Sequence, residues 1–117
     1  VDKFAHGELL NNIETVKSSN GNSNITGILA KSETIYDHIT HDSTVIVDPP
    51  RSGCDTTLIE TIKQKLPEKL VYLSCNPITQ VRDLDSLLNY YEIKNVTGYN
   101  FFPHTPHIEC LVLLERK

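Results

Sequence analysis

Three apolar, strand-like runs in this sequence each end in a turn that carries reactive side chains. The turns are Asp48-Pro49-Pro50-Arg51, Ser74-Cys75-Asn76-Pro77 and His104-Thr105-Pro106-His107, and Glu109 follows the last of them. Open α/β sheets place their ligand chemistry outside the carboxyl ends of the strands. The sequence therefore predicts part of a catalytic α/β domain.

Two of these side chains are candidates for a nucleophile and a base. Cys75 follows a buried strand pattern and precedes a helix start, where the helix dipole and free amides favour a thiolate. A buried structural cysteine is an equal alternative from position alone. Glu109 stands between Ile108 and Cys110, so partial loss of water would make its carboxylate a stronger base. A solvated glutamate at the sheet edge is the alternative.

A metal site is a further interpretation of the same region. His104, His107 and Cys110 are spaced like metal ligands. The run lacks a fourth ligand, however, and Cys110 begins an alternating strand pattern. We therefore expect no metal.

Length and composition limit the other possibilities. At 117 residues the chain is one domain at most. Its net charge of −4 gives no overall attraction to a polyanion, so RNA binding would require local cations or another domain. Three cysteines without C-x-x-C spacing fit a reducing compartment. With no signal peptide or membrane-length apolar run, we expect an intracellular, cytoplasmic protein.

The first half of the chain is predicted to alternate helices and strands. Apolar spacing indicates a helix over residues 4–18, which a polar turn over residues 19–24 ends. A short strand over residues 25–30 and a brief helix over residues 33–39 follow. The β-branched run at residues 44–47 is typical of a strand buried on both faces of a parallel sheet.

The second half continues this alternation and ends differently. Asp55 is expected to cap a helix that ends at Pro67, before a buried strand over residues 70–73. Asn76 and Pro77 then begin a helix whose inner stripe is expected to be Val81, Leu84, Leu87 and Leu88. The strand-like runs at residues 92–102 and 108–116 have no helix between them and predict a long antiparallel hairpin.

The three motifs, in this order, resemble those of the RNA (uracil-5-)-methyltransferases, S-adenosylmethionine-dependent enzymes that make 5-methyluridine in tRNA and rRNA. The resemblance covers about residues 25–117. It implies an α/β, partial Rossmann-like class I methyltransferase fold, with a parallel sheet closed by a C-terminal antiparallel hairpin. No Gly-x-Gly turn follows a strand, so we expect residues 1–117 to be the C-terminal portion of the catalytic domain. The first cofactor-binding strands would be missing, and the isolated chain would be inactive.

The resemblance also implies roles for individual residues. Cys75, in the family's Ser-Cys-Asn-Pro motif, would add to carbon 6 of uracil and so make carbon 5 nucleophilic toward the cofactor's methyl group. Glu109 would then remove the proton from carbon 5. Contacts to substrate or cofactor are expected from the remaining motif residues, which are Asp48, Pro49, Arg51, Asn76, His104 and His107. Arg82 and Asp83 are expected to form a structural ion pair.

Two other functions are also compatible with the sequence. RNA cytosine-5 methyltransferases also use a cysteine after this strand, but they usually carry a second cysteine where this chain has Arg51. A non-catalytic remnant, which binds RNA weakly or serves only as a folding or interaction unit, is the other alternative, since the Gly-rich cofactor turn is missing. We expect the partner to be RNA, and tRNA rather than rRNA. The missing N-terminal part of the enzyme is expected as a second partner. We expect binding neither to DNA nor to a membrane.

Overall fold

The computed structural model describes residues 3–20, 24–29 and 35–117. The chain divides into two compact units, Val1–Ile35 and Tyr36–Lys117. The candidate residues of all three motifs belong to the second unit.

The described part of the first unit contains the helix α1 (Lys3–Asn20), which includes the predicted helix over residues 4–18. Residues 24–29 form no strand, so the strand predicted over residues 25–30 is wrong as far as the structure describes it; Ala30 lies outside the described residues. Gly27 instead lies close to α1, since an added Cβ would be 3.2 Å from side-chain carbons of Ile13 and Leu10. A strand needs a ladder partner, and this segment packs on a helix. The polar turn predicted over residues 19–24 is described only at its ends, of which Ser19 and Asn20 still belong to α1.

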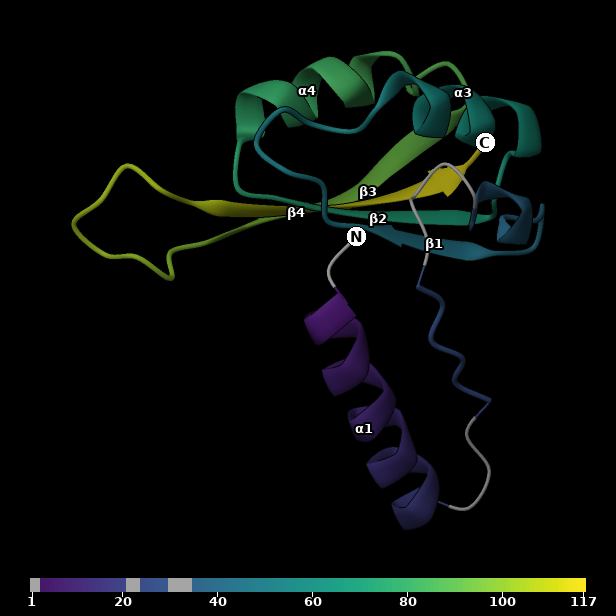
Figure 1. The fold of residues 1–117 in the computed structure, drawn as a ribbon. Coiled ribbons are helices and arrows are strands. Elements are labelled where there is room, and N and C mark those ends of the chain that lie inside the picture. The colour runs from purple at the N-terminus through teal and green to yellow at the C-terminus, as the bar shows by residue number, and fades with distance from the viewer. Residues whose placement is uncertain (1–2, 21–23, 30–34) are drawn as a thin grey trace. The chain divides into compact units, whose positions relative to one another are not determined.

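The second unit contains a four-stranded mixed sheet in the order β1-β2-β4-β3 (Figure 1). Its strands are β1 (Thr44–Val47), β2 (Lys69–Ser74), β3 (Tyr91–Tyr99) and β4 (Glu109–Arg116). β1 and β2 are parallel, whereas β4 runs antiparallel to both β2 and β3. The predicted C-terminal hairpin is confirmed, but only one strand pair is parallel, so the Rossmann-like class is confirmed in part.

Two capped helices cover one face of this sheet (Figure 1). α3 (Thr56–Lys65) begins at Asp55, whose carboxylate accepts a hydrogen bond from the Leu58 amide, and it ends just before Pro67. α4 (Pro77–Asp85) begins at Asn76, whose side chain accepts from the Ile78 amide. Both predicted N-caps are confirmed. Of the helix predicted over residues 33–39, the structure describes residues 35–39, and Tyr36–His38 form a short 3₁₀ helix, η1.

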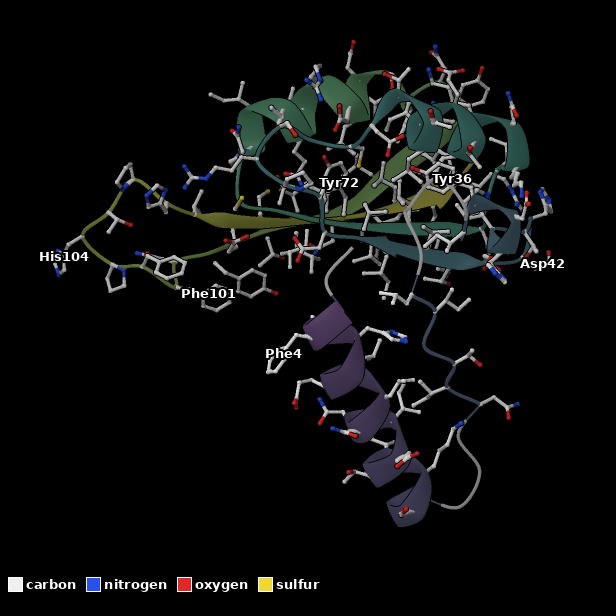
Figure 2. The ribbon with its side chains drawn as sticks, in the orientation of Figure 1. Phe4, Tyr36, Asp42, Tyr72, Phe101 and His104 are labelled. Atoms are coloured by element: carbon white, nitrogen blue, oxygen red, sulfur yellow. The ribbon has the colours of Figure 1, made fainter. Side chains whose placement is uncertain are left out.

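The core lies between these helices and the sheet. It consists of Ile59, Ile62, Leu70, Tyr72, Leu84, Leu87, Tyr91, Val112 and Leu114. Tyr72 lies near the middle of the sheet beneath α4 (Figure 2). On the opposite face of β1, the side chain of Ile46 is 73% exposed. The prediction that β1 is buried on both faces is therefore wrong for this structure.

The inner face of α4 also differs from the predicted stripe. Val81 is 64% exposed and Leu88 lies beyond the helix, also exposed. Gln80 and Asp83 are buried beside Leu84 in their place. Because Gln80 and Asp83 are polar, the spacing of apolar residues alone does not identify the buried face of α4. Among the helices that the structure describes, none has the length and apolarity to cross a membrane.

Candidate active site

A hollow of about 360 Å³ lies where β2 ends and α4 begins. It is lined by Arg51, Cys75, Asn76, Pro77, Ile78, Pro106, His107 and Ile108. Three separate stretches of chain contribute: the loop after β1, the β2–α4 turn, and the loop before β4. The hollow therefore brings residues from all three sequence motifs together.

Cys75 lies in the turn between β2 and α4, and its neighbours hold this turn in place. The buried hydroxyl of Ser74 accepts from the Asn76 amide at 3.0 Å and donates to the Asn76 carbonyl at 3.1 Å. Asn76 is the N-cap, with Pro77 at the first helical position. Cys75 is thus a half-buried thiol directly before a helix N-terminus, the position that the sequence predicts.

Glu109 opens β4 on the neighbouring strand. The antiparallel ladder pairs Ser74 with Cys110. This is the last pair of the ladder, and the residues that adjoin it are Cys75, directly after β2, and Glu109, the first residue of β4. Glu109 is half-buried and pairs with Tyr99 on its other side. The candidate nucleophile and base therefore sit at adjacent strand ends.

The loop after β1 is tied to the start of α4 by its backbone. The Arg51 carbonyl accepts from Asn76 Nδ2 at 2.9 Å and from Thr79 Oγ1 at 3.0 Å. Gly53 makes the turn possible with φ +87°, and its amide donates to the Pro50 carbonyl at 2.9 Å. Asn76 thus acts as a cap and as an anchor for this loop.

Arg51 also reaches across the hollow to the third motif. Its Nη2 lies 2.9 Å from Nδ1 of His107. The His107 amide donates to Thr105 Oγ1 at 3.3 Å, and that hydroxyl donates to the Phe102 carbonyl at 2.7 Å. Side-chain and backbone contacts together hold the imidazole beside Cys75.

A buried carboxylate supports the loop from beneath. Asp83 Oδ2 accepts from the Cys54 amide and from the Tyr72 hydroxyl, each at 2.8 Å, while Oδ1 pairs with Arg82 at 2.7 Å. Arg82 also donates to the Ser52 carbonyl at 2.9 Å. The predicted Arg82–Asp83 ion pair is confirmed, and it fastens the loop that carries Arg51.

The other two cysteines lie in settings that favour the neutral thiol. Burial raises the pKa of Cys54 to about 11, and Asp83 adds to the effect while a hydrogen bond with Tyr72 opposes it. Burial also raises the pKa of Cys110. Because thiolates are the reactive form, neither residue has the environment of a nucleophile.

Comparison with known proteins decides the family. The family model for tRNA (uracil-5-)-methyltransferase matches residues 28–117. The chain belongs to this family. The crystal structure of Pyrococcus abyssi tRNA (uracil-54, C5)-methyltransferase in complex with S-adenosyl-L-homocysteine superposes with a TM-score of 0.75 at 32% identity. The match covers 97% of this chain and 26% of that one.

Curated relatives of this methyltransferase family agree. An uncharacterized RNA methyltransferase of Bacillus cereus is 48% identical over 73 residues, and one of Staphylococcus aureus is 47% identical over 73 residues. Each match covers 62% of this chain and 16% of the relative. The chain thus corresponds to a small part of the length of these relatives.

Of the predicted site residues in this uracil-5-methyltransferase family member, four line the hollow: Arg51, Cys75, Asn76 and His107. Asp48 and Pro49, after the carboxyl end of β1, and Glu109, at the start of β4, lie outside the lining. His104 lies at the tip of the β3–β4 hairpin, away from the sheet (Figure 2). The described residues contain no group of three or more His, Cys, Asp or Glu side chains able to hold a metal ion.

Sequence reasoning missed several residues that shape the site. Pro106, Ile108 and Ile78 form apolar walls of the hollow. Gln80 Nε2 donates to the carbonyls of Tyr72 and Cys110, both at 3.0 Å, and so joins the strands that lead to Cys75 and Glu109. The sequence does contain a signal for both residues, because Ile78 lies in the first turn of a capped helix and Gln80 interrupts the apolar face of that helix.

Proposed function

We propose that the protein carrying this chain transfers a methyl group from S-adenosylmethionine to carbon 5 of a uridine in RNA, through a covalent adduct with Cys75. The observation that carries the proposal is the position of Cys75, before a helix N-terminus and in a hollow shared by all three motifs. Membership of the tRNA (uracil-5-)-methyltransferase family supports this reaction. The Pyrococcus abyssi neighbour, named for a tRNA uridine, favours tRNA over rRNA.

The chain's own residues account for the protein's part in the reaction. The Cys75 thiolate forms a bond to carbon 6 of uracil, and the displaced electron pair makes carbon 5 nucleophilic. After carbon 5 has gained the methyl group, the Glu109 carboxylate takes the proton from that carbon. The returning electron pair reforms the C5–C6 double bond and expels the thiolate. Glu109 then gives its proton to water.

The described residues fit part of the cofactor's requirements. S-adenosylmethionine supplies the electrophilic methyl group when it is bound. Because β1 and β2 are parallel, Asp48 and Cys75 lie at the same edge of the sheet. The exposed carboxylate of Asp48 can accept hydrogen bonds from the cofactor or from the flipped base, and Pro49 stiffens the turn. No glycine-rich turn follows a strand within the described residues.

A mechanism-based substrate tests the proposal. The protein expressed from the gene that encodes this chain is incubated with S-adenosylmethionine and RNA containing 5-fluorouridine, whose fluorine cannot leave as a cation. We expect a denaturant-stable protein–RNA adduct that disappears in Cys75→Ala and persists in Cys54→Ala and Cys110→Ala. Absence of an adduct would support a non-catalytic role, and an adduct that survives Cys75→Ala would overturn the nucleophile.

A further inference from the structure

The contact between Arg51 and His107 indicates which nitrogen of the imidazole carries the N–H. A guanidinium has only N–H donors. At 2.9 Å from Nη2 of Arg51, Nδ1 of His107 is therefore the acceptor. The tautomer that makes this contact has its N–H at Nε2.

The Nε2–H group is then the donor that His107 can offer to an occupant of the hollow. His107 lines the hollow together with Cys75 and Arg51. Its ring is anchored on the Nδ1 side by Arg51 and its backbone by Thr105. Because the contact with Arg51 fixes the orientation of the ring, the Nε2–H group points in a defined direction. Little further side-chain entropy is then lost when a ligand binds to it.

We propose that His107 is a specificity-determining residue, whose Nε2–H donates a hydrogen bond to the carbonyl oxygen at carbon 4 of uracil. This inference rests on the proposed function and names the group that selects its base. Uracil has an acceptor oxygen at carbon 4, whereas cytosine has an amino group of two donors there. A donor facing a donor is left unsatisfied, so the same imidazole that binds uracil disfavours cytosine.

The selectivity test compares two RNAs that differ only in the target base, 5-fluorouridine or 5-fluorocytidine, with the gene's full protein. We expect His107→Phe to slow the 5-fluorouridine adduct roughly 10- to 100-fold, and the slow 5-fluorocytidine adduct to form faster than in the wild type, because the unsatisfied imidazole donor is gone. His107→Gln, whose amide N–H can replace the imidazole donor, should recover part of the 5-fluorouridine rate. His38→Phe, the same substitution in η1, is the control.

The outcomes separate this inference from the proposed function. An adduct that requires Cys75 but keeps its base preference in His107→Phe would overturn the inference alone. A wild-type protein that forms no adduct would overturn the proposed function.

A second measurement is independent of activity. Nitrogen-15 NMR of the imidazole in the 117-residue chain should show His107 with its proton on Nε2. Arg51→Met should convert it to a mixture of tautomers. A proton on Nδ1 in the wild-type chain would refute the assignment.

Discussion

Asp83 is the buried acceptor on which the loop after β1 depends, and replacing it with asparagine measures that dependence. Its carboxylate is 5% exposed and faces donors on both oxygens. Asparagine keeps the shape but has only one oxygen. Its amide oxygen should turn toward the two inner donors, the Cys54 amide and the Tyr72 hydroxyl, and leave its NH₂ group facing Arg82.

The magnitude follows from these contacts. The Arg82 side chain is 59% exposed and can turn to water, so loss of the ion pair should cost only about 1 kcal/mol. The two inner hydrogen bonds lose their charge assistance, at about 0.5–1 kcal/mol each. We therefore expect Asp83→Asn to lower the free energy of unfolding by about 2–3 kcal/mol, out of a typical total of roughly 5–15 kcal/mol.

Urea unfolding of the 117-residue chain, followed by circular dichroism, provides the measurement. The midpoint should fall by about 1–2 M. Asp85→Asn is the matched control, because Asp85 is an exposed residue of the same helix and the substitution changes the net charge equally. An equal fall in both variants would mean that charge, and not the buried acceptor, sets the stability. A midpoint unchanged in Asp83→Asn would refute the reasoning.

Three further predictions concern single positions. Glu109→Gln should still form the adduct but accumulate methylated, protein-linked RNA, with turnover slowed roughly a hundredfold to ten-thousandfold; normal turnover in a gel assay would exclude the role of base. Gly53→Ala should lower the midpoint of thermal unfolding, because the backbone at this position has φ +87°. The added methyl group would also lie 2.5 Å from Arg82 Nη2 and 2.6 Å from Asp83 Oδ2. An unchanged midpoint would contradict this prediction. Since burial raises the pKa of Cys54 from 9.0 to about 11, the native thiol should react with iodoacetamide at pH 8 about a hundredfold more slowly than in the unfolded chain. Its rate should rise until the pH approaches 11, and equal rates in both states at pH 8 would be the contrary result.

The features that sequence predicted well are those with local causes. The bounds of β1 coincide with a β-branched run, and the start of α4 follows from a capping asparagine and a proline at the first helical position. That the three motifs lie close together also follows from the sequence. Each motif directly follows or precedes a strand, and these strands belong to one sheet. For this reason the candidate residues Arg51, Cys75 and His107 could be named before the hollow was known.

The features that were missed have distant causes. Asp83 and Gln80 are buried because their partners at Cys54, Tyr72 and Cys110 lie elsewhere in the chain, and helical periodicity carries no information about those partners. Residues 25–29 are apolar enough for a strand but gain no ladder. A strand exists only where a neighbour supplies hydrogen bonds, so composition alone overpredicts it.

The amide of Gln80 has a consequence for how natural variants of this protein are judged. One nitrogen, placed across the ends of β2 and β4, donates to two backbone carbonyls. Glutamate has the same size and outline, and similarity scales treat the exchange as mild. At this position it would press carboxylate oxygens against carbonyl oxygens without any change in volume. Methionine fills similar space without charge and should lower the stability less than glutamate does. A similarity scale would therefore predict the wrong order of severity for these two variants at position 80.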